Sequence, residues 1–296
     1  MKIIVTGATG WIGRSALEEI DRSFPRNIEL IGISRSPKQL TLDSGRIVKL
    51  VTKTDESIQQ NVIGLVHTAF PTQNLITHMG PDKYNSECEI LLNWLKDYLQ
   101  ESKPNWLISI SSGVLSVGDS FDPRHSGDLA LYSKWKKIEE NIALESSIES
   151  VLIGRLFSAS GRFMTKPKSY ALGDFITSGI LGETISVRSL LESKRSYIDA
   201  EEFLCVLLKS VNMNERLVID SSGIVLSIVE LATIVQEFFP NSTLKVPSKL
   251  QSGSDDYFSR DPIRFENLAE TSNIEISGIR EQISRTITGI RKSSQS

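Results

Sequence analysis

Short apolar runs alternate with segments of helical periodicity over the first half of this 296-residue chain. Such runs are typical of buried strands, and an apolar residue at every third or fourth position is typical of a helix packed on them. The predicted strands are Lys2–Val5, Glu29–Ile33, Arg46–Val51, Gly64–His67, Trp106–Ser111 and Val151–Arg155. The clearest helices between them are Tyr84–Ser102 and Leu131–Leu144. This alternation predicts an α/β fold with a doubly wound parallel sheet.

The second half is less regular. Gly161 to Leu181 is rich in Gly, Lys, Pro and Ser, and we expect it to be loosely structured. A further strand is predicted at Leu217–Asp220, a capped amphipathic helix at Ser227–Phe239, and one late helix near Ile279–Ile290. We therefore expect a first domain of residues 1–160 plus about 195–225, and a smaller, partly discontinuous C-terminal lobe of about 161–194 and 226–296.

Composition excludes several classes of protein. The net charge of −3 gives no reason to expect nucleic acid or a membrane surface as partner. Cys88 and Cys205 are too few for a disulfide framework or a structural zinc site, so no metal is expected. The low number of cysteines also leads us to expect a reducing, cytoplasmic location. No apolar run approaches the length of a membrane span.

The segment Thr6–Gly13 (TGATGWIG) joins the first predicted strand to a helical segment. Glycines at such a turn let the backbone bend tightly and approach a diphosphate without a Cβ in the way. The N-terminus of the following helix offers unpaired N–H groups and a partial positive charge. A glycine turn between strand and helix therefore predicts a dinucleotide-binding Rossmann fold.

The end of the second predicted strand bears on the choice of dinucleotide. In dinucleotide-binding folds a carboxylate here takes the ribose hydroxyls of NAD, whereas a cation takes the 2′-phosphate of NADP. This chain has Ser34-Arg35-Ser36 and no acidic residue at that strand end. Because a guanidinium binds phosphate bidentately, the sequence favours NADP, with NAD as the alternative.

Candidate proton-transfer chemistry lies on the predicted helix Leu131–Leu144. Tyr132 and Lys136 are four residues apart, which places the phenol and the ammonium close together beside a predicted buried stripe of Leu131, Trp135, Ile138 and Ile142. A free phenol has a pKa near ~10, and a nearby cation lowers it. Hydroxyl groups also follow the strand Trp106–Ser111, at the strand end where ligands of such sheets bind.

These features belong to a larger set of motifs. The set comprises Thr6–Gly13 (TGATGWIG), Val66–Phe70 (VHTAF), Tyr84-Asn85, Ser109–Gly113 (SISSG), Tyr132–Lys136 (YSKWK), Gly154–Gly161 (GRLFSASG) and Arg195–Phe203 (RSYIDAEEF). In this order the motifs cover nearly the whole chain and resemble the short-chain dehydrogenase/reductase superfamily. The resemblance is to its extended branch of nucleotide-sugar epimerases, dehydratases and ketoreductases.

The resemblance implies a role for each matching residue. Tyr132 would be the general acid/base, Lys136 the cation that lowers its pKa and binds the ribose, and Ser112 the donor to the substrate oxygen, with Ser111 as alternative. The implied cofactor-binding residues are Gly7, Thr9, Gly10, Trp11, Ile12, Gly13, Thr68, Ala69, Phe70, Asn85, Lys136 and Leu156, in addition to Ser34, Arg35 and Ser36. The implied substrate-binding residues are Ser111, Gly113, Phe157, Ser158 and Arg195.

Departures from the family pattern affect the substrate and the reaction. Ser158 replaces an Asn that often holds the substrate diphosphate, and an Arg-Pro-Gly-Asp element is reduced to Ser252–Asp255. A nucleotide-diphosphate sugar is the expected substrate, and another small carbonyl compound is the alternative. A dehydratase would need an Asp-Glu pair where Gly113-Val114 stands, which disfavours that reaction.

Ketoreduction needs only Ser, Tyr and Lys around the carbonyl group and uses NADPH. We therefore predict NADPH-dependent reduction of a keto group on a nucleotide sugar of the 4-keto-6-deoxyhexose type. An NAD-dependent 4-epimerase is the alternative reaction, and a non-catalytic dinucleotide sensor is an alternative of another class.

Three further features are noted. His67 ends a predicted buried strand, where a packed structural histidine and a functional one are both open. The basic run Lys134–Lys137 is followed by Glu139 and Glu140, which disfavours nucleic acid binding. The helices 84–102 and 131–144 could form a homodimer interface, as they often do in the family.

Overall fold

The computed structural model describes residues 1–117, 127–211, 214–249 and 251–294. The chain divides into two compact units, Met1–Leu156 with Leu204–Asp220 and Phe157–Phe203 with Ser221–Ser296. Residues of about 195–225 were expected in the first unit as one segment, but the structure groups 195–203 and 221–225 with the second. The reason is strand pairing: β11 (Lys194–Asp199) pairs with β8 (Ser158–Ser160) and β13 (Ile224–Ser227) of that unit.

The described part of the first unit is built on an eight-stranded sheet in the order β12-β7-β6-β5-β1-β2-β4-β3. The strands are β1 (Lys2–Thr6), β2 (Glu29–Ile33), β3 (Lys38–Thr41), β4 (Ile47–Val51), β5 (Val62–His67), β6 (Trp106–Ser112), β7 (Ser150–Leu156) and β12 (Arg216–Asp220). They pair in parallel, except that β3 pairs antiparallel with β4. The chain continues from β1 to β2 on one side and later returns to β5 on the other. This reversal is the switch point at which such sheets bind ligands, and the predicted α/β Rossmann fold is confirmed.

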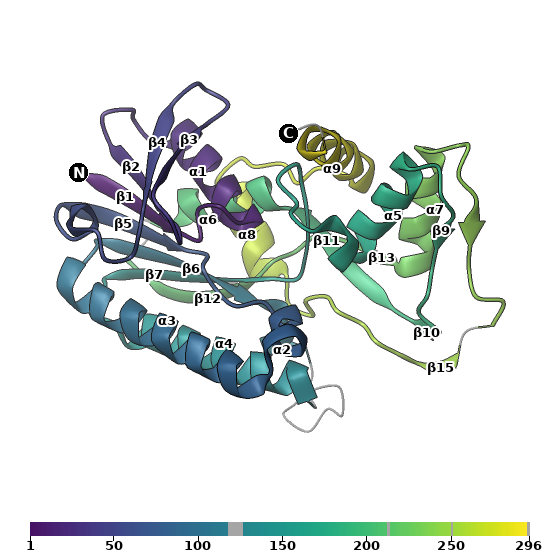
Figure 1. Ribbon diagram of the computed structural model, residues 1–296, viewed down its shortest axis with the longest axis horizontal. Coiled ribbons are helices and arrows are strands. Elements are labelled where there is room, and N and C mark those ends of the chain that lie inside the picture. The colour runs from purple at the N-terminus through teal and green to yellow at the C-terminus, as the bar shows by residue number, and fades with distance from the viewer. Residues whose placement is uncertain (118–126, 212–213, 250, 295–296) are drawn as a thin grey trace. The chain divides into compact units, whose positions relative to one another are not determined.

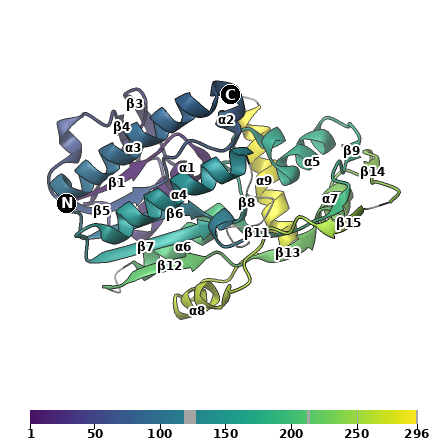
Figure 2. The same cartoon turned by 90° about the horizontal axis from the view of Figure 1, so that it is seen from below.

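Helices cover both faces of this sheet. Helix α1 (Trp11–Ser23) lies on one face, and α3 (Pro81–Ser102) and α4 (Gly127–Glu145) lie side by side on the other (Figure 1 and Figure 2). The short helix α2 (Asn74–Met79) precedes α3, and 3₁₀ turns are formed by η1 (Glu56–Ile58) and η2 (Gly113–Leu115). Helix α6 (Ala200–Ser210) begins in the second unit and ends in the first.

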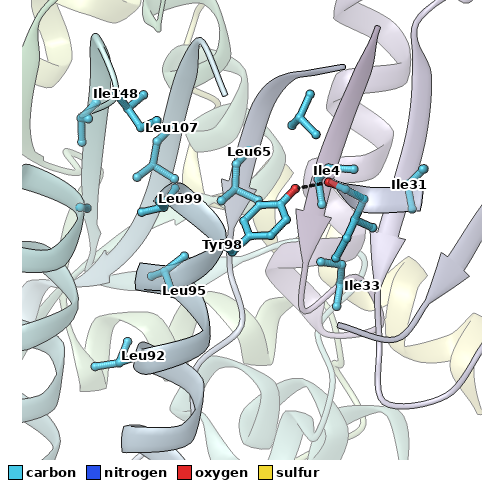
Figure 3. Packing of buried hydrophobic residues seen from close by; sticks show 14 of the residues in the cluster. Ile4, Ile31, Ile33, Leu65, Leu92, Leu95, Tyr98, Leu99, Leu107 and Ile148 are labelled. Atoms are coloured by element: carbon cyan, nitrogen blue, oxygen red, sulfur yellow. Dashed lines mark hydrogen bonds between the residues drawn. The ribbon is translucent and has the colours of Figure 1, made fainter. Parts of the chain in front are cut away.

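The core between the sheet and α3 is apolar and closed to water. Figure 3 shows Ile4, Ile31, Leu65 and Leu107 of four strands facing Leu92, Leu95, Tyr98 and Leu99 of α3. The Tyr98 hydroxyl donates a 2.7 Å hydrogen bond to the carbonyl oxygen of Ile58, so its polar group is satisfied inside this core. Strands covered by helices on both faces carry continuous apolar runs, which is why the sequence pattern located them.

The second unit contains a three-stranded sheet in the order β13-β11-β8. Its helices are α5 (Ala171–Ile180), α7 (Ile228–Glu237), α8 (Ile263–Thr271) and α9 (Ile279–Ser293), with a 3₁₀ turn η4 (Pro167–Ser169). Two short strand pairs join β9 (Ile185–Ser186) to β14 (Leu244–Lys245) and β10 (Leu191–Glu192) to β15 (Gln251–Ser254).

The expectation of a loose segment from Gly161 to Leu181 was wrong for its second half. Helix α5 buries Leu172, Phe175 and Ile176, so apolar spacing outweighs the glycines at its other positions. Helix α8 was also missed. The capped helix was predicted correctly, because Ser227 and Glu230 form a reciprocal capping box at the start of α7. Among the described residues, no helix is long and apolar enough to cross a membrane.

Candidate active site

The turn between β1 and α1 is shaped for close approach of a ligand to its backbone. Gly7 has φ +65°, a conformation that side chains rarely adopt, and a Cβ on Gly13 would lie 2.2 Å from the Gly7 carbonyl oxygen. Helix α1 begins at the N-cap Gly10 without a side-chain cap. Gly7 is therefore required by its backbone conformation and Gly13 by packing, and the first N–H groups of the helix suit a diphosphate.

The end of β2 lies beside this turn. Strands β1 and β2 pair from Lys2↔Glu29 to Thr6↔Ile33, and the Ala8 N–H donates to the Ile33 carbonyl oxygen at 3.2 Å. After β2, the Ser34 hydroxyl donates to the carbonyl oxygen of Ser36 at 2.6 Å, which shapes the loop around the exposed Arg35. A solvent-accessible guanidinium is thus next to the glycine turn.

The segment after β5 is fastened to the same turn through Thr6. The Thr6 hydroxyl oxygen accepts hydrogen bonds from the backbone N–H groups of Thr68 and Ala69, at 3.0 and 3.1 Å. The Thr68 hydroxyl donates to the Thr6 carbonyl oxygen at 2.6 Å. Thr68 and Ala69, both predicted to line a cofactor, are therefore held at the carboxyl end of β1.

Tyr132 and Lys136 meet at Phe70. The Lys136 ammonium nitrogen lies 4.0 Å from the centre of the Phe70 ring, and that ring packs edge-on against Tyr132 at 5.9 Å between centroids. The same ammonium donates a 2.9 Å hydrogen bond to the Ile110 carbonyl oxygen on β6. The structure therefore brings the helix motif, the end of β6 and the segment after β5 into one cluster.

The two candidate serines at the end of β6 differ in their partners. The Ser111 hydroxyl donates to Glu140 Oε1 at 2.7 Å, and this carboxylate also binds the Arg155 guanidinium through two 2.7 Å contacts. The Ser112 hydroxyl oxygen accepts a hydrogen bond from the Val114 N–H where Gly113 opens η2. Ser111 is thus part of a buried ion-pair network, whereas Ser112 lies at the strand terminus.

The face that α4 buries differs from the predicted one. Leu131, Trp135, Ile138 and Ile142 are only half-buried, and the fully buried side chains of α4 are Lys136, Glu139, Glu140 and Ala143. The prediction failed because each of these charged groups has a charged partner inside the protein. The half-buried stripe packs towards α3, where Trp135 Nε1 donates a 2.7 Å hydrogen bond to Asn85 Oδ1.

Glu139 is not among the predicted site residues, but it contacts one of them, Lys136. Its Oε2 atom lies 2.6 Å from the Lys136 nitrogen, and its Oε1 atom lies 3.3 Å from Nε2 of His67. Burial raises the pKa of the Glu139 carboxyl, but the Lys136 ammonium and His67 outweigh burial and hold that pKa below its ordinary value. The spacing of three residues between Lys136 and Glu139 was the signal that could have identified the pair.

Three predicted substrate residues belong to the second unit. Phe157 and Arg195 both contact Tyr257: the two rings are 5.0 Å apart, and the guanidinium lies 5.5 Å from the Tyr257 ring. Arg195 also forms a 2.8 Å ion pair with Asp255, and Ser158 pairs with Tyr197 between β8 and β11. Leu156 is the last residue of β7 in the first unit. The contacts of Tyr257 were not anticipated.

Comparison with known proteins supports the fold. No protein-family model and no curated protein matches the chain. Among solved structures, MoeE5 in complex with UDP-glucose and NAD has a TM-score of 0.76 at 17% identity, covering 99% of this chain and 100% of its own. The NAD-dependent NDP-hexosamine 5,6-dehydratase TunA has a TM-score of 0.75 at 17% identity, covering 98% of both chains. UDP-glucose 4-epimerase from Thermotoga maritima has a TM-score of 0.75 at 15% identity, covering 99% of this chain and 100% of its own.

The chain has the fold of these nucleotide-sugar enzymes. The resemblance that its motifs carry is confirmed for the fold over the whole length. At identities this low, the residues of the chain itself must support any statement about chemistry.

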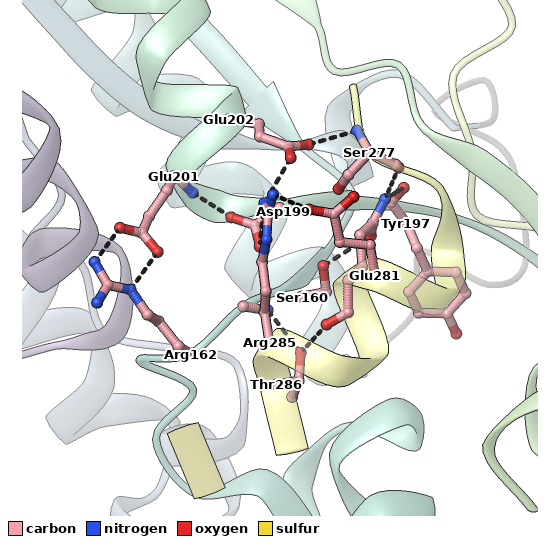
Figure 4. Close-up of polar contacts among 12 residues, drawn as sticks. Ser160, Arg162, Tyr197, Asp199, Glu201, Glu202, Ser277, Glu281, Arg285 and Thr286 are labelled. Carbon is pink, nitrogen blue, oxygen red and sulfur yellow. Dashed lines mark hydrogen bonds and ion pairs between the residues drawn. The ribbon is translucent and has the colours of Figure 1, made fainter. Parts of the chain in front are cut away.

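A second polar cluster lies within the second unit (Figure 4). The Arg285 guanidinium is 3.5 Å from Asp199, 2.6 Å from Glu202 and 2.5 Å from Glu281. Burial, aided by the nearby Glu202 and Glu201, raises the pKa of the Asp199 carboxyl to about 6. Its Oδ1 atom accepts a 2.8 Å hydrogen bond from the Glu201 N–H at the start of α6. The cluster ties α9 to the end of β11, which indicates a structural role.

Proposed function

We propose that this chain is an NADP(H)-dependent oxidoreductase that reduces a keto group on a nucleotide-diphosphate sugar of the 4-keto-6-deoxyhexose type. The observation that carries the proposal is the position of Lys136. Its ammonium lies one helical turn beyond Tyr132 and is hydrogen-bonded to Ile110, two residues before Ser112 on β6. This hydrogen bond supports a common site in the first unit for Tyr132, Lys136 and the serine-bearing end of β6.

The dinucleotide would be held by the glycine turn, whose Gly7 and Gly13 leave no room for a side chain, with Thr68, Ala69 and Phe70 beside it. When bound, it supplies a hydride to the carbonyl carbon. Tyr132 would donate its phenolic proton to the carbonyl oxygen as negative charge develops there. The Lys136 charge stabilises the phenolate that remains, and the Ser112 hydroxyl would polarise the carbonyl group.

Arg35 supports the choice of NADP. It is exposed at the end of β2, beside the glycine turn, and a guanidinium there suits the 2′-phosphate. Phe157, Ser158 and Arg195 are proposed to contact the substrate, because they match the family positions that do so. The helices α3 and α4 are proposed as a homodimer interface on the same ground.

An NAD-dependent 4-epimerase is the second candidate. It is favoured by the similar structures, which include a UDP-glucose 4-epimerase and a protein that binds UDP-glucose and NAD. Both candidates use the same tyrosine, lysine and serine, but the epimerase must retain its dinucleotide through a full cycle of oxidation and reduction.

The experiment separates the candidates by cofactor and by product. The purified protein is first denatured and any released dinucleotide identified. It is then mixed with NADPH or NADH and UDP-4-keto-6-deoxyglucose, and separately with UDP-glucose alone. Stoichiometric NADPH oxidation supports the reductase, and UDP-galactose formation with co-purified NAD supports the epimerase.

A Tyr132→Phe variant identifies the acid. It should lose turnover by about 10²-fold or more while still binding the dinucleotide, because only the proton donor is removed. Full activity of this variant would contradict the proposed mechanism, and dinucleotide binding without any turnover of the wild type would favour a sensor.

A further inference from the structure

A buried ion pair lies directly behind the proposed proton donor. Lys136 and Glu139 are both on α4, 2.6 Å apart, and their side chains are 5% and 1% exposed. The ammonium also donates to the Ile110 carbonyl oxygen, and the Phe70 ring covers it on a third side. The Lys136 ammonium is therefore contacted by a carboxylate, a backbone carbonyl group and an aromatic ring of the protein.

The second carboxylate oxygen of Glu139 faces His67, and a hydrogen bond from Thr6 determines which ring nitrogen of that histidine carries the proton. The Thr6 hydroxyl oxygen already accepts two backbone N–H groups, which fill its two lone pairs. Its own proton must therefore point at His67 Nδ1, 2.9 Å away. This assigns the ring proton of a neutral His67 to Nε2, the atom that lies 3.3 Å from Glu139 Oε1.

Within the described part of the chain, the other ionisable groups that face the pair are either neutral or paired elsewhere. From α3, Tyr84 and Cys88 face it, and burial raises the pKa of the Cys88 thiol to about 11 and that of the Tyr84 phenol further above its ordinary value. Both are thus neutral at physiological pH. The neighbouring Glu140 is neutralised by Arg155 of β7, and Tyr132 is one turn away on α4 itself. Glu139 is therefore the counter-ion of Lys136.

We propose that Glu139 is a positioning residue for the reaction: buried beside Lys136 and close to His67, whose ring Thr6 orients, it keeps the Lys136 ammonium charged and fixed one helical turn from Tyr132. This inference rests on the proposed function for its purpose, but its physical content can be tested without turnover. Thr6, at the end of β1, thereby links the glycine turn to the charge state of the helix motif.

Without the Glu139 carboxylate, the Lys136 ammonium should give up its proton more readily. A buried ammonium without a counter-ion loses its proton readily, and buried lysines have pKa values as low as ~5–6. Replacing Glu139 by Gln keeps the shape of the side chain and removes its charge. We expect the pKa of Lys136 to fall by at least about two units in Glu139→Gln, a hundredfold loss of proton affinity.

The titration is measured by NMR on protein labelled with ¹³C at the lysine Cε carbons. The Lys136 signal is identified by its loss in Lys136→Met. In Glu139→Gln this signal should titrate at least about two pH units lower than it does in the wild type. An unchanged titration would overturn the inference. Glu145→Gln, an exposed glutamate on the same helix, is the matched control and should leave the signal unaltered.

Failure of Glu139→Gln to fold is resolved by a double variant. In Glu139→Gln/Lys136→Met both buried charges are gone. If Glu139 acts through its charge, this double variant should fold, and its denaturant midpoint of unfolding should be higher than that of Glu139→Gln. A double variant as unstable as the single one would show that Glu139 acts by its shape, and would overturn the proposal.

The reaction gives an independent readout. If the wild type reduces the keto sugar, Glu139→Gln should lower kcat above the new Lys136 pKa and leave KM for the dinucleotide within about threefold. Glu139→Asp, which restores a carboxylate, should recover most of kcat. If the wild type turns over no substrate, the proposed function fails while the lysine titration still decides the role of Glu139.

Discussion

The hydroxyl of Ser111 donates a 2.7 Å hydrogen bond to Glu140, a buried carboxylate that is itself clamped by Arg155. Its neighbour Ser112 instead occupies the strand terminus, where its oxygen accepts the Val114 N–H. Two adjacent hydroxyls of the same chemical type therefore have different surroundings, and on this ground we propose that Ser111 is structural and that Ser112 binds the substrate.

Substitution of the two serines should have different effects. Ser112→Ala is expected to lower turnover by about 10²-fold, because a hydrogen bond to the developing oxyanion is lost. Ser111→Ala should change turnover by only a few fold and lower the free energy of unfolding by about 1–2 kcal/mol, because a buried bond to a charged group is lost. Steady-state kinetics and urea unfolding of both variants test this, and equal losses of turnover would refute the distinction.

A methyl group on Gly13 should abolish dinucleotide binding. Its Cβ would lie 2.2 Å from the Gly7 carbonyl oxygen, so the turn must open to admit it. Gly278→Ala is the matched control, because this glycine lies at the start of a helix, as the N-cap of α9, but a Cβ there meets nothing within 4 Å. Titration calorimetry with NADPH and NADH should show no binding to Gly13→Ala and unchanged binding to Gly278→Ala.

Reversing the charge at Arg35 should reverse the dinucleotide preference. In Arg35→Glu a carboxylate would repel the 2′-phosphate of NADP and could accept the ribose hydroxyls of NAD. We expect the ratio of the Kd for NADPH to that for NADH to rise by at least about tenfold. Arg260→Glu, an exposed arginine of the second unit, serves as the control for net charge. An unaltered ratio in Arg35→Glu would mean that this guanidinium does not bind the phosphate.

Asp199 should make the stability of the protein depend on pH. Its pKa is raised from 3.8 to about 6 in the folded chain, so its proton stabilises the fold fully below pH ~4. This contribution is lost as the pH rises through about 6, and amounts to about 3 kcal/mol at most. Asp199→Asn keeps the acceptor for the Glu201 N–H and should flatten the dependence between pH 4 and 7.

Urea unfolding at pH 4.5 and 7.5 measures the effect. The difference in unfolding free energy between the two pH values should change by about 1–3 kcal/mol in Asp199→Asn, and not in Asp261→Asn, an exposed control in the same unit. An equal pH dependence in the wild type and in Asp199→Asn would show that this carboxyl titrates normally.

The parallel strands of the first unit and the glycine turn could be predicted because their signals are local. β2 was located to the residue, since the apolar run Leu30–Ile33 follows Glu29 directly and ends at the polar Ser34. The glycine turn was recognised because its residues follow from backbone geometry rather than from distant contacts. The same holds for α7, whose capping box lies within four consecutive residues.

What could not be predicted depends on contacts between distant residues. Glu139 and Glu140 look like a solvated helix face, and their burial follows only once His67 of β5 and Arg155 of β7 are placed opposite them. The extent of the second unit depended on β11 pairing with strands on both sides of it in sequence, which no local pattern encodes. Helix α5 was concealed by its own glycines, Gly173 and Gly179, where a Cβ would collide with packed neighbours.

The path of the chain, which leaves the first unit after Leu156 and returns to it through Leu204–Asp220, restricts how the protein can be divided. A fragment ending at Leu156 would lack β12, the strand that pairs with β7 along its outer side. The backbone N–H and C=O groups of β7 would then be exposed and could pair with strands of other copies, which promotes aggregation. Truncation at this boundary should therefore give insoluble protein, whereas joining 1–156 to 204–220 through a short linker would keep the sheet edge complete.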